Sequence, residues 1–171
     1  MSKVNNNLLI LGAGQYGAVA SEIADSMGCF DRIDFLDDNA PEHAVGFFND
    51  CQYLLTSYSY ATVAIGNPEL RALWLDRLRE YGYKIPVLIH SQAYVSPAAT
   101  IGEGTIVEPN ATIQAHVRVG NACLICSGSV LKHNCEVGDV CYIDCNSTVM
   151  PETCVPSGTR VNANSVYFFR K

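Results

Sequence analysis

Three glycines and a pair of aspartates near the start of the chain have the types and spacing of a nucleotide site. Gly12, Gly14 and Gly17 follow an apolar run and precede a helical pattern, and Asp37 and Asp38 come later. Glycines at such a turn let the backbone approach a phosphate, which the N-terminus of the next helix attracts. An acidic residue about twenty positions further on can bind a ribose hydroxyl. A tight turn that needs glycine for its geometry alone is the open alternative.

The elements around these residues resemble half of a Rossmann unit, within residues 1–86. Strands are expected at 7–12, 32–36 and 60–65, and helices at about 15–27 and 69–81. A complete dinucleotide site usually takes two such halves. A mononucleotide or a sugar nucleotide therefore fits this domain better than a redox cofactor does.

The second half of the chain, residues 87–171, has a strict six-residue repeat. Every sixth position from Ile89 to Val161 is Val, Ile or Leu, thirteen in succession, and a mostly small residue lies two positions before each. Period six fits neither a helix nor a simple alternating strand, but it suits short strands joined by tight turns around a prism. With three repeats per coil, the pattern predicts a parallel β-helix of a little over four coils.

The eight cysteines are expected to be free thiols. The start of the chain has no apolar stretch of signal-peptide form, so we expect a cytoplasmic protein, in a compartment that keeps thiols reduced. Cys123 and Cys126 form a C-x-x-C pair, but no second pair follows at finger-like spacing. No metal site is therefore expected, and the repeat explains most of these cysteines as small buried residues.

The composition excludes several classes of partner. Hydrophobic residues make up 49% and charged residues 16% of the chain, and the net charge is -6. This balance is typical of a globular protein. An acidic surface repels nucleic-acid phosphates and anionic lipid, so we expect neither nucleic acid nor a membrane as partner.

The two parts in this order resemble the hexapeptide-repeat acyltransferases, specifically the sugar O- and N-acetyltransferases of the sialic-acid and bacillosamine type. The resembling stretches, from about Leu8 to Gly138, are LILGAGQYGAVASEIAD, FLDDN, VAIGNPELR, PVLIHSQAYVSPAATIGEGTIVEPNATI and SGSVLKHNCEVGD. The resemblance implies an α/β half-Rossmann domain followed by an all-β left-handed parallel β-helix. It also implies a homotrimer with acetyl-CoA bound between neighbouring prisms. The implied reaction acetylates an amino or hydroxyl group of a nucleotide-linked sugar for surface-glycan synthesis.

The resemblance assigns roles to individual residues. His133 matches the catalytic histidine, which accepts a proton from the attacking group, as an imidazole can near neutral pH. Asn134 stands where a usually acidic residue orients that histidine. Tyr142 stands in the CoA site, where a second histidine close to the thioester is often found. The residues matched to nucleotide-sugar binding are Gly12, Gly14, Gln15, Tyr16, Gly17, Asp37, Asp38, Gly66 and Asn67.

Departures from the family pattern keep other functions open. Asn134 has no charge to stabilise an imidazolium, Tyr16 replaces a common histidine, and the family usually adds further coils after Val161. A non-catalytic trimeric protein that binds the sugar nucleotide and has lost the CoA groove is therefore the alternative. The terminal stretch SVYFFRK would cap the last coil or contact a partner.

Two readings of the histidines compete with the catalytic one. His133 could be an ordinary solvated surface side chain. His116 and His133 lie seventeen residues apart, near one coil, which suggests the zinc hydrolyases built on trimeric β-helices. Gly138 stands where those enzymes have a third histidine, so this reading is the weaker one.

Overall fold

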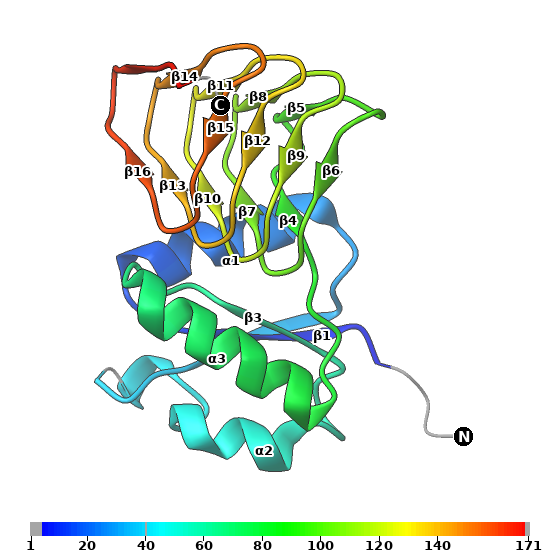
Figure 1. The fold of residues 1–171 in the computed structure, drawn as a ribbon. Helices are drawn as coiled ribbons and strands as arrows, with labels where there is room; N and C mark the ends of the chain where they lie inside the picture. The colour runs from blue at the N-terminus through cyan, green and yellow to red at the C-terminus, as the bar shows by residue number, and fades with distance from the viewer. Residues whose placement is uncertain (1–4, 40, 170–171) are drawn as a thin grey trace. The chain divides into compact units, whose positions relative to one another are not determined.

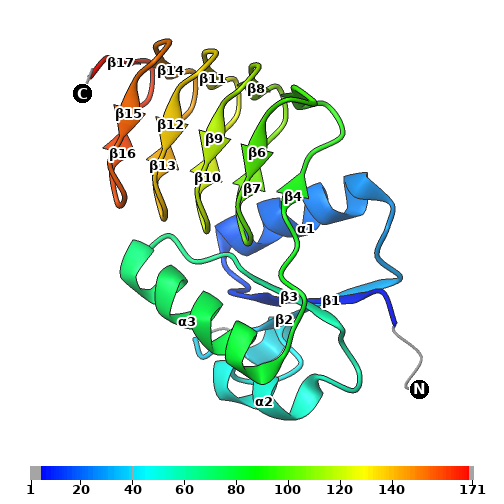
Figure 2. The same ribbon diagram turned by 45° about the vertical axis from the view of Figure 1, so that its right-hand side comes forward.

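The computed structural model describes residues 5–39 and 41–169, in two compact units, Met1–Pro86 and Val87–Lys171. The expected fold class is confirmed: a half-Rossmann α/β unit precedes an all-β parallel β-helix (Figures 1 and 2). Of the terminal stretch SVYFFRK, Arg170 and Lys171 lie outside the described residues. No helix in the described ranges is both long enough and apolar enough to cross a membrane.

The first unit is built on a three-stranded parallel sheet of order β2-β1-β3. Its main elements are β1 (Asn7–Leu11), α1 (Gln15–Met27), β2 (Arg32–Leu36), β3 (Tyr60–Val63) and α3 (Pro68–Tyr81). Side chains alternate across a strand, so Leu9 and Leu11 of β1 share a core with Trp74 and Leu78 of α3. Helix α1 covers the other face of the sheet (Figure 1).

The helices begin and end where the sequence indicates. Asn67 caps α3, because its side-chain oxygen accepts a 2.8 Å hydrogen bond from the Leu70 amide. Gly28 and Gly82 close α1 and α3 in the left-handed conformation. Three short helices between β2 and β3 are not predicted, because each is too short to show a periodic pattern; they are η1 (Pro41–His43), η2 (Phe48–Asp50) and α2 (Cys51–Leu54).

The second unit winds fourteen two-residue strands into three parallel sheets over the part of the chain described. The strand orders are β16-β13-β10-β7-β4, β17-β14-β11-β8-β5 and β15-β12-β9-β6. Each strand pairs with the one 18 residues further on, as Leu124 does with Tyr142. The strands are β4 (Leu88–Ile89), β5 (Tyr94–Val95), β6 (Thr100–Ile101), β7 (Ile106–Val107), β8 (Thr112–Ile113), β9 (Arg118–Val119), β10 (Leu124–Ile125), β11 (Val130–Leu131), β12 (Glu136–Val137), β13 (Tyr142–Ile143), β14 (Thr148–Val149), β15 (Cys154–Val155), β16 (Arg160–Val161) and β17 (Val166–Tyr167).

The repeat fills the inside of the prism. The aliphatic residues from Val107 to Val161 are buried in one continuous core, together with the small residues Ala111, Cys123, Cys135 and Cys141. All eight cysteines are free thiols. The frame runs one step past the predicted thirteen positions to Tyr167, which packs against the end of the same core.

The turns between strands share one backbone feature. The third residue after each aliphatic position from Ile101 to Val161 has a positive φ. At the corners that join the β6-β9-β12-β15 sheet to the β4-to-β16 sheet, these residues are Gly104, Ala122, Val140 and Gly158. A β-branched residue in this conformation is strained, so Val140, with φ of 53°, stores unfavourable energy.

Replacing Val140 with glycine should raise the free energy of unfolding by about 1 kcal/mol, because the relief of strain exceeds the extra chain entropy that glycine loses on folding. For a chain of this size that corresponds to a melting temperature higher by about 2–4 °C. Calorimetry or urea unfolding measures the change.

The matched control is Gly158→Val, at the same turn position one coil later. A Cβ there has no neighbour within 4 Å, so the Cβ adds no clash to the backbone strain. This variant should be less stable by about 1 kcal/mol or more. A loss of stability in both variants would contradict the strain at Val140.

Candidate active site

The glycine turn forms part of a cavity of about 330 Å³ in the first unit. Five of the nine residues expected to bind a nucleotide sugar line this cavity: Gly12, Gly14, Tyr16, Asp37 and Gly66. Phe48, Ile65 and Leu70 add an apolar lining that the sequence motifs do not indicate. An apolar lining beside exposed backbone suits a nucleotide, which has both a ring system and phosphates.

The N-terminus of α1 gives this cavity an anion-attracting end. Gly14 precedes the helix without a side-chain cap, and the first turn contains no acidic residue. A Cβ at Gly14 would have no neighbour within 4 Å, so the space beside this backbone is open. The positive end of the helix dipole favours a phosphate here.

The two aspartates hold the loops around the cavity. The Asp37 carboxylate accepts hydrogen bonds from the amides of Ala13 and Asn39, both at 2.7 Å, and is only 8% exposed. Asp38 accepts a 2.9 Å bond from the Phe48 amide. Both carboxylates therefore fix the local backbone, a role that the ribose-binding motif does not predict.

The remaining predicted residues lie beside the cavity rather than in its lining. Gly17 is buried in α1 against the Gly12 carbonyl, Asn67 caps α3, and Gln15 is exposed at the first position of α1. Arg71, which no sequence motif indicates, is 1% exposed. Its guanidinium donates to the carbonyls of Ile65 and Gly66 at 2.8 and 3.1 Å, which fixes the loop after β3.

In the second unit, His133 lies exposed in the turn between β11 and β12. Its backbone amide donates to Gln114 Oε1 at 3.1 Å, and the Asn134 amide donates to the Ala115 carbonyl at 3.1 Å. Asn134 has a φ of 60°, a conformation that asparagine tolerates well. The turn is therefore fixed to the preceding coil while the imidazole faces solvent.

Asn134 also sets the proton position on the imidazole. Its Nδ2 lies 3.0 Å from His133 Nδ1. An amide nitrogen only donates hydrogen bonds, so in this orientation Nδ1 of the ring is the acceptor. The neutral ring then carries its proton on Nε2, and Nε2 cannot accept another. Rotating the side-chain amide of Asn134 by a half-turn exchanges its oxygen and nitrogen without changing the space that it fills. Oδ1 then accepts a hydrogen bond from a proton on Nδ1, and Nε2 is free to accept a proton.

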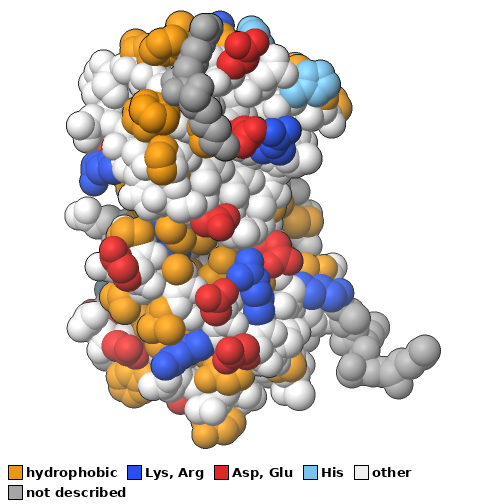
Figure 3. All heavy atoms as spheres, viewed as in Figure 1, with side chains coloured by type: hydrophobic (Ala, Val, Ile, Leu, Met, Phe, Trp, Pro, Cys, Tyr) orange, Lys and Arg blue, Asp and Glu red, His pale blue; other side chains and the backbone are white. Residues whose placement is uncertain are grey.

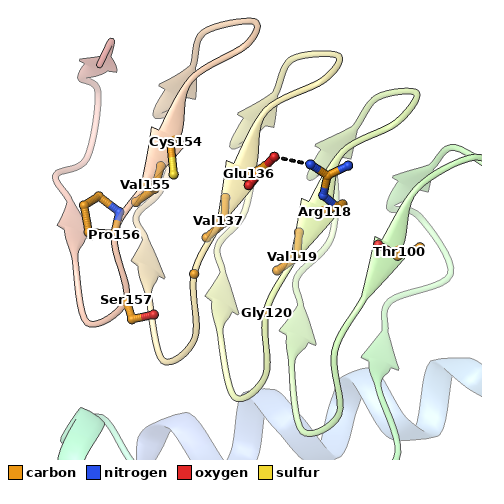
Figure 4. Close-up of a pocket in the computed structure, with 11 residues that line it drawn as sticks. Thr100, Arg118, Val119, Gly120, Glu136, Val137, Cys154, Val155, Pro156 and Ser157 are labelled. Atoms are coloured by element: carbon orange, nitrogen blue, oxygen red, sulfur yellow. Dashed lines mark hydrogen bonds and ion pairs between the residues drawn. The ribbon is translucent and has the colours of Figure 1, made fainter. Parts of the chain in front are cut away.

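A groove of about 450 Å³ runs across the β9-β12-β15 face and includes the Arg118–Glu136 ion pair (Figure 4). A smaller hollow of about 80 Å³ is lined by Asn134 and by Glu136 and Cys154, which also line the groove. The hollow therefore lies next to the groove and reaches Asn134, in the turn that carries His133. On the face seen in Figure 3, acidic and basic side chains are intermixed, unlike the basic stripe of a nucleic-acid site.

Tyr142 lies on another face of the prism. It belongs to β13, whereas the turn with His133 joins the other two sheets and so forms the opposite corner. The Arg160 guanidinium carbon lies 4.4 Å from the Tyr142 ring centroid. Burial, and then a hydrogen bond with Cys126, raises the pKa of Tyr142 well above its usual range. One protomer therefore does not bring Tyr142 and His133 together.

The two histidines of the zinc-hydrolyase alternative do not stack. His116 occupies the left-handed turn position, which Asn134 occupies one coil later, so His133 is one residue out of step. Among the described residues, the group of side chains close enough to share a metal ion contains neither histidine.

Comparison with known proteins gives matches in both units. The family model for the PglD N-terminal domain matches residues 7–78, and the bacterial transferase hexapeptide model, of six repeats, matches residues 98–133. The bifunctional protein GlmU of Thermodesulfovibrio yellowstonii is 32% identical over 68 residues. That match covers 40% of this chain and 15% of GlmU, so the chain corresponds to a small part of that relative.

Solved structures match nearly the whole chain. The acetyltransferase domain of PglB from Neisseria gonorrhoeae, in complex with acetyl coenzyme A, has a TM-score of 0.90 at 28% identity, covering 95% of this chain and 82% of that one. A variant of perosamine N-acetyltransferase from Caulobacter crescentus, in complex with CoA and GDP-perosamine, has a TM-score of 0.78 at 23% identity, covering 94% and 90%. The second likeness concerns the fold alone. With a family model matched in each unit and an acetyltransferase domain matched along nearly the full length, the chain is similar to the hexapeptide-repeat sugar acetyltransferases in both of its parts.

Proposed function

We propose that this protein is an acetyl-CoA-dependent acetyltransferase that acts on an amino or hydroxyl group of a nucleotide-linked sugar, in surface-glycan synthesis. The observation that carries the proposal is the exposed His133 imidazole, held by Asn134 at a turn beside the groove of the β-helix. The likeness to an acetyl-CoA-bound acetyltransferase domain supports the choice of co-substrate.

The first unit would hold the nucleotide. Phosphates would lie at the N-terminus of α1, and the base or ribose against the apolar lining that includes Phe48 and Leu70. Perosamine N-acetyltransferase, which shares the fold, has been solved with GDP-perosamine. That complex supports a nucleotide sugar as the substrate class.

The transfer step would proceed by direct attack on the thioester. His133 accepts a proton from the sugar amine or hydroxyl as that group bonds to the acetyl carbon, and the tetrahedral intermediate then expels CoA as its thiolate. The proton held by His133 returns to the thiolate, so the products are the acetylated sugar and free CoA. Such a base typically contributes a factor of about 10² to 10⁴ in rate.

A second protomer would complete the active site. His133 lies at one corner of the prism, and Tyr142 lies on the face opposite that corner. A site that uses both residues therefore takes each of them from a different chain. A closed cyclic assembly has this property, and a homotrimer with acetyl-CoA between neighbouring prisms is the arrangement we propose. Light scattering tests it: a monomer at working concentration would contradict the shared site.

The function is tested by measuring acetyl-CoA consumption with a panel of UDP-, GDP- and CMP-linked amino sugars. The expected result is turnover with at least one of them, and thermal stabilisation by both co-substrates, because selective binding to the native state raises the melting temperature. Stabilisation by a nucleotide sugar, with neither stabilisation nor turnover from acetyl-CoA, would instead support the non-catalytic alternative.

Replacing Asn134 with aspartate should shift the acidic limb of the pH–rate profile to higher pH by about one unit, because a neighbouring carboxylate favours a protonated imidazole. The carboxylate can only accept, so it also fixes the Nδ1–H form and frees Nε2. Aspartate tolerates the left-handed conformation at this position. If the acidic limb of the plot of kcat/KM against pH stays where it is in the wild type, residue 134 does not orient the base.

A further inference from the structure

A second set of reactive side chains lies at another corner of the β-helix. Glu108, Cys126 and Cys145 each offer one ligand atom, and these three atoms all lie within 4.8 Å of one another. The residues follow β7, β10 and β13, which are neighbours in one sheet. Three successive coils therefore each supply one side chain to the same point.

The surroundings of this cluster are largely closed to solvent. Glu108 is 9% exposed and Cys126 is 1% exposed. The amide and the hydroxyl of Ser127 donate to Glu108 Oε2 at 3.0 and 2.9 Å, which fixes the orientation of the carboxylate. In metal sites, hydrogen bonds of this kind from neighbouring residues orient the side chains that bind the ion.

The buried thiol of Cys126 has an unusual environment. Burial raises its pKa far above the usual range, and the charge of Glu108 raises it further. The thiol is hydrogen-bonded to the Glu108 carboxylate and to Tyr142, so its neighbours hold the sulfur in place beside the carboxylate. A cation at this point would take the place of the thiol proton, since it stabilises thiolate and carboxylate together.

We propose that Glu108, Cys126 and Cys145 bind one zinc ion. Two thiolates with a carboxylate form a donor set suited to Zn²⁺, whereas calcium and magnesium prefer oxygen alone. Thiolates on a tetrahedral zinc lie about 3.8 Å apart, so the ligand atoms would close up by at most about 1 Å. Three protein ligands leave the fourth position for water, and Cys145 is the less buried of the two thiols.

The other close pair of thiols differs in the features that matter. Cys123 and Cys141 are hydrogen-bonded to each other in the core. Their sulfurs also donate to the carbonyls of Gly138 and Pro156, at 3.0 and 3.2 Å. The metal-ligand group found among the described residues does not include them. This pair therefore provides a matched control for a thiol change that leaves the proposed site intact.

The test uses full-length protein, freed of metal with a chelator and kept reduced, and titrated with Zn²⁺ against a chromophoric chelator. The expected result is one tightly bound zinc per chain and a rise in melting temperature on binding. Titration with Co²⁺ should give thiolate-to-metal charge-transfer absorption and the visible bands of a tetrahedral site. Neither readout depends on acetyl transfer, so failure of the proposed function leaves this test unaffected.

Cys126→Ser, Cys145→Ser and Glu108→Gln should each weaken zinc binding at least tenfold. Cys141→Ser should leave it unchanged, and so should Cys29→Ser, which changes an exposed thiol of the first unit. Circular dichroism of the metal-free variants shows whether each one folds, and Glu108→Gln keeps the shape of the site where a serine variant does not. The proposal is overturned if the reduced wild type binds no stoichiometric zinc. It is equally overturned if binding survives in Cys126→Ser and Glu108→Gln, or is lost in Cys29→Ser, since the ion would then be held elsewhere.

Discussion

Replacing His133 with alanine should lower kcat for acetyl transfer at least a hundredfold, because the variant has no group to accept the proton of the attacking amine or hydroxyl. General bases of this kind contribute about 10² to 10⁴ in rate. The imidazole is exposed, and the contacts that fix its turn are made by backbone amides. The melting temperature and the KM for both substrates should therefore change little. Release of CoA, followed with a thiol reagent, measures the effect against a protein-only blank.

His116→Ala is the matched control for this experiment. His116 is also exposed, lies at the same corner one coil earlier, and has no role in the proposed step. This variant should keep kcat within about twofold of the wild-type value, a much smaller change than the loss of a general base causes. A His133→Ala enzyme with unchanged kcat at neutral pH would remove the imidazole from the mechanism and leave positioning as the main source of rate.

Replacing Gly17 with alanine should lower the free energy of unfolding of the first unit by about 3 kcal/mol or more, at the upper end of the cost of overpacking. A Cβ at this position would lie 2.0 Å from the Gly12 carbonyl oxygen and 2.9 Å from its carbon, both of them backbone atoms. Alanine is the better helix former by about 1 kcal/mol, but that gain is smaller than the cost of moving the glycine turn. Urea unfolding gives the stability, and thermal stabilisation by nucleotide sugar, which should be lost, gives the binding.

Gly14→Ala separates this packing effect from a general effect of losing glycine in the turn. Gly14 has a negative φ, and nothing lies within 4 Å of its would-be Cβ. The free energy of unfolding of the Gly14→Ala variant should differ from that of the wild type by less than about 1 kcal/mol. Equal losses in the two variants would indicate that backbone freedom, rather than the contact between Gly17 and Gly12, is what the turn requires.

Much of the fold could be predicted from the sequence because the β-helix repeats its pattern without interruption. The Val, Ile and Leu frame from Ile89 to Val161 gives nearly every strand of the second unit. Gly28 and Gly82 mark the ends of α1 and α3 by a local backbone requirement. Such signals are short-range, so they can be read without knowing what packs against what.

The parts that could not be predicted depend on contacts between distant residues. The Asp37 carboxylate lies where a ribose-binding residue is expected, but its bonds to the Ala13 and Asn39 amides follow only from the folded loops. Arg71 resembles any polar residue of an amphipathic helix until its buried bonds to the loop after β3 are seen. Glu108, Cys126 and Cys145 have no short spacing motif, because their proximity comes from the 18-residue length of a coil.

The alternation within each coil also bears on how such a protein can acquire new chemistry. The aliphatic side chains point inward and maintain the core, whereas the exposed turn side chains, such as those of His116 and His133, lie at the corners outside it. Changing a turn side chain therefore alters a row of donors along the prism edge without disturbing the register of the coils. A protein built in this way can exchange one exposed reactive group for another at low cost in stability, as at the exposed turn positions of His116 and His133.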